Sequence, residues 1–223
     1  KTKNSITEFE LANMDKDDVT GNNRHAFFFR DNRTLKNSLK SSNNVGGWDG
    51  TLISSNVNIG GISDLTYFND FSNTVSRVGR THIKRQAEIN RTDYGSFGHL
   101  KTSARTVDYQ LAKTDLTEQY SVLPQVRVKF NTHEKNKELK YNFNGEVSIF
   151  SHTYDTKADG TRLSLYPSIE YPFKTPGWEL TSKVGLKHRS YSLSKNTNNS
   201  ISQTTPILSL RGKMIFDRIS SKN

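Results

Sequence analysis

The sequence contains 223 residues, with 32 Lys and Arg against 22 Asp and Glu, and its formal net charge is +10. Only 32% of the residues are apolar, whereas an ordinary soluble domain, counted with glycine, has roughly 45–50%. The 12 Phe, 9 Tyr and 2 Trp argue against a disordered chain, and the lack of Cys excludes disulfide bonds and Cys-ligated zinc within this sequence. The longest unbroken apolar run, Ala26–Phe29, is far shorter than the roughly 20 residues of a transmembrane helix.

Alternation of apolar and polar residues along the chain predicts about ten β-strands. These strands are long, about 10–14 residues, whereas strands of soluble proteins usually have about 5–6. Segments of about 9–11 tilted residues are long enough to cross a bilayer. In chain order, the predicted strands are centred near Phe9, Phe28, Val57, Ala87, Ala104, Val128, Val147, Ile169, Val184 and Met214.

The clearest alternation lies between Thr161 and Phe173. Because successive side chains of a strand point to opposite faces, this segment has one apolar and one largely polar face. The apolar face comprises Leu163, Leu165, Pro167, Ile169, Tyr171 and Phe173, and the other face comprises Arg162, Ser164, Tyr166, Ser168, Glu170 and Pro172. Similar alternation occurs in Gln125–Thr132, Lys137–His152 and Pro206–Phe216. No window of comparable length has a helical period, so the sequence predicts an all-β fold.

The connections between the predicted strands alternate in length from the fourth strand onward. The short ones are Asp93–Phe97, His133–Lys137 and Lys174–Gly177, and the long ones are Gln110–Gln119, Thr153–Gly160 and Ser194–Gln203. Outer-membrane β-barrels have short periplasmic turns and longer extracellular loops, so this pattern favours such a barrel. Asn32–Gly47 breaks the pattern, because it is long where a short turn is expected, and a missed short strand is one explanation.

Two folds are compatible with the alternation itself. A soluble β-sandwich that serves as a binding module would turn the apolar faces inward. A section of a large antiparallel transmembrane β-barrel would turn them toward lipid and line a lumen with the polar faces. The strand lengths, the loop pattern and the low apolar fraction favour the barrel. About ten strands in an open sheet would leave two unpaired edges in lipid, so we expect the 223 residues to form a single barrel segment of a longer chain.

Four segments resemble, in the same order along the chain, segments of the lipopolysaccharide-assembly outer-membrane protein family LptD, also called OstA or Imp. The segments are Ser63-Asp64 with Tyr67, Phe68, Asn69, Asp70 and Phe71; Tyr120–Gln125 with Pro124; Gly160–Pro172 with Pro167; and Pro206–Arg218 with Gly212 and Arg218. The resemblance rests on the ordered set rather than on any one segment. The prediction for residues 1–60 rests on the alternation alone.

The resemblance implies a barrel of about 26 strands in the outer membrane of a Gram-negative bacterium. It also implies a preceding periplasmic jellyroll domain, which is absent from this sequence and through which the family meets the periplasmic lipopolysaccharide-bridge proteins. A lipoprotein resembling LptE would plug the lumen. The implied function is delivery of lipopolysaccharide to the outer leaflet, without catalysis, and a passive porin-type channel is the alternative that shares the same barrel physics.

Basic residues on the predicted polar faces are candidates for contact with lipopolysaccharide. Phosphates and sugar carboxylates of that lipid would be attracted by guanidinium and ammonium groups in a lumen. The candidates are Arg127, Lys129, Arg162, Lys183, Lys187, Arg189, Arg211 and Lys213. The alternative is that these cations pair across strands with Glu146, Glu170 and Glu179. Pro167, which has no backbone N–H, should also loosen strand pairing locally.

The sequence gives no support for a catalytic, cofactor or metal site. The six His residues lie far apart without metal-ligand spacing, and no Gly-rich phosphate-binding loop occurs. His152 with Asp155 and Asp159 could mimic part of a hydrolase site, but no nucleophile stands out beside them. Basic residues are spread through nearly every strand instead of clustering with stacking aromatic residues, which argues against nucleic-acid binding.

Overall fold

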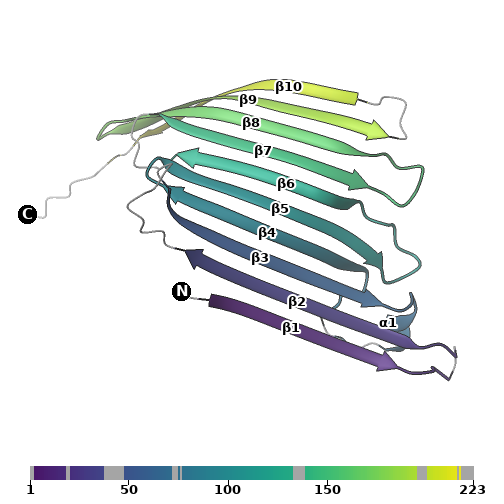
Figure 1. Ribbon diagram of the computed structural model, residues 1–223. Helices are drawn as coiled ribbons and strands as arrows, with labels where there is room; N and C mark the ends of the chain where they lie inside the picture. The colour runs from purple at the N-terminus through teal and green to yellow at the C-terminus, as the bar shows by residue number, and fades with distance from the viewer. Residues whose placement is uncertain are drawn as a thin grey trace, which may run out of the picture.

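The computed structural model describes residues 3–18, 21–37, 48–71, 75, 77–132, 139–194, 200–214 and 216. Ten strands form one antiparallel sheet in which each strand pairs with its neighbours in chain order (Figure 1). The elements are β1 (Lys3–Met14), β2 (Arg24–Asn37), β3 (Trp48–Ile62), α1 (Tyr67–Asp70), β4 (His82–Gly95), β5 (Gly98–Leu111), β6 (Ser121–Thr132), β7 (Lys140–Ser151), β8 (Asp159–Lys174), β9 (Trp178–Ser194) and β10 (Ser200–Met214). The strands have 12 to 17 residues, so the predicted all-β fold with long strands is confirmed.

The last strand differs from the prediction. Met214, the predicted centre, is the final residue of β10, which already begins at Ser200. Residues 200–205 are polar except Ile201, yet they continue the pairing with β9, in which Ser200 lies opposite Ser192. The predicted loop Ser194–Gln203 is therefore too long, and residues 195–199 within it lie outside the described residues.

The connections at the two ends of the sheet differ in length. We call the end at which β2 begins and β3 ends the α1 rim, because α1 follows there, and the other end the opposite rim. At the opposite rim, residues 96–97 and 175–177 form short turns, whereas residues 112–120 and 152–158 form longer connections at the α1 rim. The predicted alternation is confirmed for these four connections.

Two predicted connections fall partly or wholly outside the described residues. Asn32–Gly47 was expected to be one long loop, but β2 continues to Asn37 through its pairing with β3. Residues 38–47 lie outside the described part, and so does the whole of the predicted turn His133–Lys137. In the described residues, α1 has four residues, and no helix there is long and apolar enough to cross a membrane.

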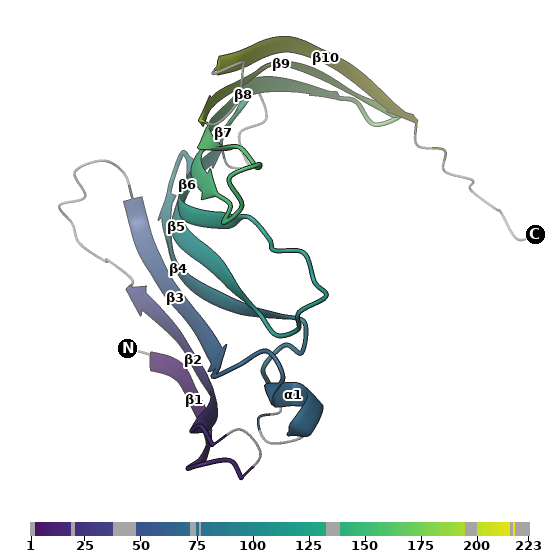
Figure 2. The same ribbon diagram turned by 90° about the vertical axis from the view of Figure 1, so that its right-hand side faces the viewer.

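The position of α1 identifies the two faces of the sheet. Figure 2 shows a strongly curved sheet with α1 on its inner, concave side. Tyr67 and Phe68 of α1 are buried in one cluster with Ala26, Phe28 and Ile62 of the sheet. Because residues two apart on a strand share a face, and so do paired residues, the register extends this assignment from strand to strand. In this way the concave face passes from Phe28 through Arg30, Asn58, Gln86, Glu88, Arg105, Gln125 and Ser148 to Arg162.

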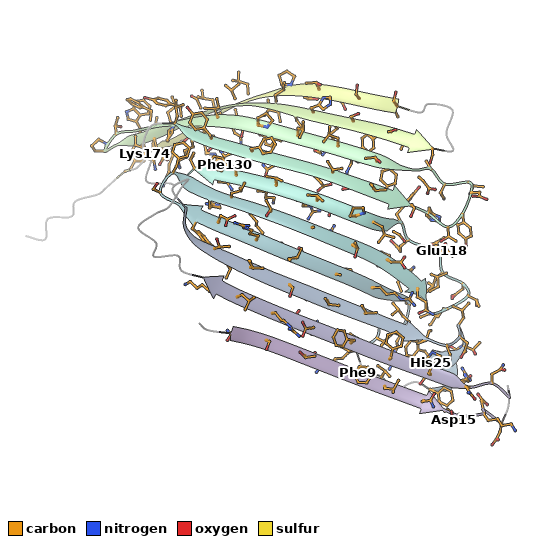
Figure 3. The ribbon with its side chains drawn as sticks, viewed as in Figure 1. Phe9, Asp15, His25, Glu118, Phe130 and Lys174 are labelled. Atoms are coloured by element: carbon orange, nitrogen blue, oxygen red, sulfur yellow. The ribbon has the colours of Figure 1, made fainter. Side chains whose placement is uncertain are left out.

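Apolar side chains on the convex face are exposed. Figure 3 shows the side chains of the described strands along the whole sheet. On the convex face, Ile169 pairs with Val184, which pairs with Leu208, and all three are exposed, Leu208 to 83%. A soluble sandwich would bury this set between two sheets, so the arrangement excludes that alternative for the described strands.

Buried apolar side chains gather instead at the α1 rim. They pack around α1 on the concave face and at the start of β4. The cluster comprises Ala26, Phe28, Ile62, Tyr67, Phe68, Val75, Val78, Ile83 and Ala112. This end of the sheet is therefore the part that is organised like the core of a globular domain.

Candidate functional site

All eight basic candidates lie on the concave face. Arg127 pairs with Glu146, Glu146 with Ser164, and Ser164 with Arg189, so these residues form one row across β6 to β9. The remaining candidates occupy the same alternating positions of their strands: Lys129 on β6, Arg162 on β8, Lys183 and Lys187 on β9, and Arg211 and Lys213 on β10. The register thus brings together on one surface residues that are up to 86 positions apart in the sequence, 213 − 127 = 86.

Glu146 is the centre of a polar network on this face. Arg127 Nε donates to Glu146 Oε2 at 2.7 Å, and Arg162 Nη2 donates to Glu146 Oε1. Ser148 Oγ also donates to Oε1, at 3.0 Å, and Gln125 Nε2 donates to Ser148 Oγ at 2.9 Å. One carboxylate therefore holds two guanidinium groups from different strands, and charge-assisted bonds of this kind are the strong ones.

A second pair involves Lys183 of β9. Its Nζ lies 3.0 Å from Glu170 Oε1 and 5.4 Å from the centre of the Tyr166 ring. Gly185 makes room for that ring, because a Cβ atom at position 185 would lie 2.8 Å from Tyr166 Cε2. Lys183 is therefore held by both a carboxylate and an aromatic face.

The alternative of cross-strand pairing is correct for three of the eight candidates. Arg127 and Arg162 pair with Glu146, and Lys183 pairs with Glu170. Glu179 pairs with Lys174 at 3.0 Å, and Lys174 was not among the candidates. Within the described residues, no ion pair is found for the other five, which are Lys129, Lys187, Arg189, Arg211 and Lys213.

The prolines and glycines of the family segments occupy irregular or open positions. Pro124 lies in a bulge of β6, where the register shifts between Val122 and Gln125, and the lack of a backbone N–H suits such an interruption. Next to Pro167 the ladder to β9 pairs Leu165 with His188 and resumes at Ser168 with Gly185, as expected for a residue without a ladder donor. Gly212 lies in β10, and Arg218 lies outside the described residues.

The family segment with Tyr67, Phe68, Asn69, Asp70 and Phe71 forms α1 and its C-terminal cap. Three of these residues, Tyr67, Asp70 and Phe71, contact Arg24 of β2. Arg24, which is 3% exposed, donates to Asp17 at 2.9 Å, to Asp70 at 2.7 Å and to both oxygens of Asp64 at 2.9 and 3.0 Å. Its guanidinium carbon also lies 4.8 Å from the centre of the Phe71 ring. We call Arg24, Asp17, Asp64 and Asp70 the Arg24 cluster.

Sequence reasoning missed Arg24, although it found the residues around it. No local pattern links the start of one strand with a loop 40 residues later. The signal that could have pointed to it is the excess of acidic side chains in the Ser63–Phe71 segment, which needs a cation nearby. Asp64 itself is partly buried, which alone would raise its pKa, but hydrogen bonds from Ser63, Thr66 and Arg24 lower the pKa to about 2.

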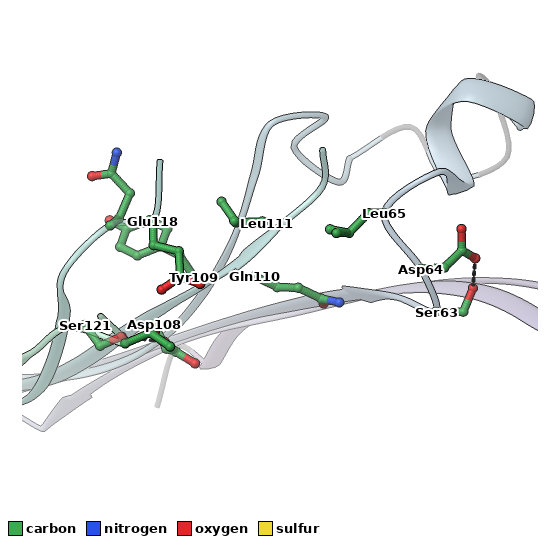
Figure 4. A pocket seen from close by; sticks show the side chains of 11 residues that line it. Ser63, Asp64, Leu65, Asp108, Tyr109, Gln110, Leu111, Glu118 and Ser121 are labelled. Atoms are coloured by element: carbon green, nitrogen blue, oxygen red, sulfur yellow. Dashed lines mark hydrogen bonds between the residues drawn. The ribbon is translucent and has the colours of Figure 1, made fainter. Parts of the chain in front are cut away.

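A pocket lies next to the Arg24 cluster at the α1 rim. Figure 4 shows it between the loop that leads to α1 and the β5–β6 region. Its volume is about 380 Å³, and Asp64, Asp108 and Glu118 are among its lining residues. Asp64 is bound by Arg24, and Asp108 accepts a hydrogen bond from Ser121 Oγ at 2.6 Å. The pocket is therefore walled partly by carboxylates that already have protein partners.

His152 has a structural environment in place of a catalytic one. Its Nδ1 accepts from the backbone N–H of Tyr154 at 3.1 Å, and its Nε2 lies 3.3 Å from the carbonyl oxygen of Glu118. Asp159 accepts a hydrogen bond from the backbone N–H of His152, so this hydrogen bond does not involve the imidazole ring. Both ring nitrogens therefore face backbone groups of the α1 rim.

Comparison with known proteins gives consistent matches. The family model for LptD, described as LPS transport system D, matches residues 22–222. A protein of Aromatoleum aromaticum named LPS-assembly protein LptD is 29% identical over 165 residues, which is 73% of this chain and 20% of that protein. Proteins of the same name from Methylococcus capsulatus and Nitrosospira multiformis are 30% and 31% identical over 178 and 179 residues, which cover 78% and 76% of this chain and 17% and 19% of theirs. The chain thus spans about a fifth of the length of these relatives.

Proposed function

The chain belongs to the LptD family, and we propose that it forms part of the wall of an outer-membrane β-barrel that delivers lipopolysaccharide to the cell surface. In this role the convex face contacts lipid and the concave face lines the lumen. The supporting observation is the division between the faces of β6 to β10, where all Arg, Lys and Glu residues are concave, whereas Val184 and Leu208 are convex and exposed. Such a division is what a bilayer on one side and water on the other require.

We infer that the five concave cations without an ion pair are the stronger candidates for contact with lipopolysaccharide. Lys129, Lys187, Arg189, Arg211 and Lys213 have their charges available for phosphate or carboxylate groups of a passing lipid. Arg127, Arg162 and Lys183 are held by Glu146 and Glu170 and instead stabilise the wall. This division refines the set of eight that sequence reasoning proposed.

The remaining parts of the translocon are proposed from the family. A periplasmic jellyroll domain outside this segment would receive lipopolysaccharide from the periplasmic bridge proteins. A lipoprotein of the LptE type would occupy part of the lumen and so face the concave surface. A passive porin-type channel would need the same two faces, and the LptD match is the reason to prefer lipopolysaccharide delivery.

Photocrosslinking in the full-length protein tests this proposal. A photoreactive amino acid is placed at Arg211 or Lys213, which are concave, and at the adjacent convex Leu210 or Met214 as matched controls. All four lie toward the opposite rim, whose short turns are expected in the periplasm, so the convex controls would contact phospholipid of the inner leaflet. We expect crosslinks to lipopolysaccharide at the two concave positions. These crosslinks should disappear when the synthesis of lipopolysaccharide is stopped.

Two outcomes would contradict the transport path. Equal crosslinking from Leu210 and Met214 would show that the concave face has no special access to lipopolysaccharide. The absence of crosslinks from both Arg211 and Lys213 while the protein still supports lipopolysaccharide export would place the path elsewhere.

A further inference from the structure

Two Arg–Asp pairs lie on the convex face of the first strands. Arg33 Nε is 2.7 Å from Asp31 Oδ2 on β2, and Arg91 Nε is 2.9 Å from Asp93 Oδ2 on β4. Asp31 pairs with Val57 and Arg91 with Ile53, so both pairs share the face that carries exposed apolar residues. Within the strands β6 to β10, by contrast, every Arg, Lys and Glu is concave.

The two pairs are built in the same way. Thr7 Oγ1 donates to Asp31 Oδ1 at 2.6 Å, and Thr51 Oγ1 donates to Asp93 Oδ1 at 2.7 Å. Both carboxylates are buried, whereas the side chains of Arg33 and Arg91 are 54% and 59% exposed. A guanidinium has five N–H donors, and the contacts described for Arg33 and Arg91 use only part of them. Each pair therefore presents outward-facing donors that its own Asp does not occupy.

The apolar band on the convex face crosses the strands obliquely. On β2 it lies toward the α1 rim, at Phe27 and Phe29, and is followed by Asp31 and Arg33, with the exposed Leu35 beyond them. On β10 the order is reversed, because Ser202 and Thr204 lie toward the α1 rim and Leu208 and Leu210 lie farther along. Strands of membrane barrels tilt by about 35–45°, so a band parallel to the membrane must cross them in this way. On β2 and β4, Arg33 and Arg91 thus lie on the side of the band toward the opposite rim, where Leu35 and Ile53 are their exposed apolar neighbours on the convex face.

Given the proposed membrane location, on which this inference rests, we propose that Arg33 and Arg91 bind phosphate groups of phospholipid head groups. An unpaired Arg on the lipid face costs about 2–4 kcal/mol at the bilayer midplane and about 0–1 kcal/mol near the interfaces. The paired Asp holds each guanidinium in place at that boundary, and the free N–H groups meet phosphate oxygens. The leaflet is the one at the opposite rim, where phospholipid is the expected lipid.

The first experiment locates the site without altering either pair. A fluorescent amino acid replaces Ser55, which pairs with Arg33 across β2 and β3, or Val184 in the apolar band, in the full-length protein in phospholipid nanodiscs. Quenchers are attached to the lipid head group or to the end of the acyl chain. We expect the head-group quencher to act more strongly at position 55 and the chain-end quencher more strongly at position 184.

The second experiment tests phosphate binding. The melting temperature of the full-length protein is compared in bilayers of phosphatidylethanolamine and of a phosphate-free glycolipid. We expect the melting temperature to be higher in phosphatidylethanolamine than in the glycolipid, both for the unaltered protein and for the control Arg30→Gln. Arg30 is a suitable control because it is concave and pairs with Glu8. The double variant Arg33→Gln and Arg91→Gln should lose this difference.

The outcomes separate this inference from the proposed function. If neither quencher acts at position 184, the membrane location itself is wrong. If position 184 responds to the chain-end quencher but position 55 does not respond to the head-group quencher, the head-group site alone is wrong. The same holds if the double variant folds and keeps the full dependence on phosphate-bearing lipid.

Discussion

Arg24 donates two hydrogen bonds to the carboxylate of Asp64, from Nε to Oδ2 at 3.0 Å and from Nη2 to Oδ1 at 2.9 Å. The first residue of β2 is thereby joined to the loop that follows β3. Because Arg24 also bonds Asp17 and Asp70, it ties the β1–β2 connection, the loop before α1 and α1 itself to the sheet. This cluster fixes α1 on the concave face, where its aromatic residues cover Ala26 and Phe28.

Replacing Arg24 should destabilise the protein strongly. Arg24→Gln leaves three Asp carboxylates without their shared cation, and breaking a buried pair in this way costs about 3–5 kcal/mol. The free energy of unfolding of the full-length barrel in urea measures the effect. Arg77→Gln is the control, since Arg77 pairs with Glu8 while 45% exposed, and exposed pairs contribute about 0–1 kcal/mol. Equal losses in the two variants would contradict a special role for Arg24.

Acid should weaken the same cluster. The pKa of Asp64 is lowered from 3.8 to about 2, and a carboxyl group with a lowered pKa stabilises the fold above its unfolded pKa and loses that contribution as pH falls. We therefore expect the backbone amides of residues 63–71 to become less protected from hydrogen exchange between about pH 4 and pH 2, after correction for intrinsic rates. The variant Asp64→Asn should lack this pH dependence of protection. An unchanged pH dependence in that variant would show that another group titrates.

The sheet could be predicted from the sequence because its main signal is local. A strand places residues such as Leu163 and Arg162 on opposite faces whatever its partners are, so alternation locates strands without knowledge of the fold. That signal fades in residues 200–205, where only Ile201 is apolar, and there the pairing of Ser200 with Ser192 defines the strand. Strand existence was therefore more predictable than strand ends.

The candidate site was predictable only as a face. Alternation assigned Arg127 and Arg211 to the polar side, and the register confirms that they share it. Alternation cannot tell which cations are paired, because Arg162 and Glu146 lie on different strands and meet only through the register. Arg24 escaped detection for the same reason, since its partners lie as far away as Asp70, 46 residues along the chain.

Gly185 should tolerate no side chain. A Cβ atom there would lie 2.8 Å from Tyr166 Cε2 and 3.1 Å from Ser168 Cβ, so Gly185→Ala should push the Tyr166 ring away from Lys183. Overpacking of this kind costs about 1–3 kcal/mol, measured as the free energy of unfolding of the full-length protein. Gly212→Ala is the matched control in the neighbouring strand, because no atom lies within 4 Å of its Cβ position. A loss at position 212 as large as that at position 185 would mean that contact with Tyr166 is not the cause.

Adjacent residues of β10 should respond oppositely to a positive charge. Leu208 is convex, 83% exposed and close to the middle of the strand, whereas Ser209 is concave and pairs with Lys183. Leu208→Arg should therefore lower the free energy of unfolding in a bilayer by about 2–4 kcal/mol, the cost of Arg on the lipid face near the midplane. Ser209→Arg places the same charge in the hydrated lumen and should cost much less.

The comparison is made in the full-length barrel, both in lipid and in a water-soluble polymer that replaces the bilayer. The difference between the two variants should shrink in the polymer if lipid is its cause, because a flexible polymer lets water reach the guanidinium. A larger loss for Ser209→Arg than for Leu208→Arg would reverse the assignment of the two faces, and with it the placement of the cations Arg211 and Lys213 in the lumen.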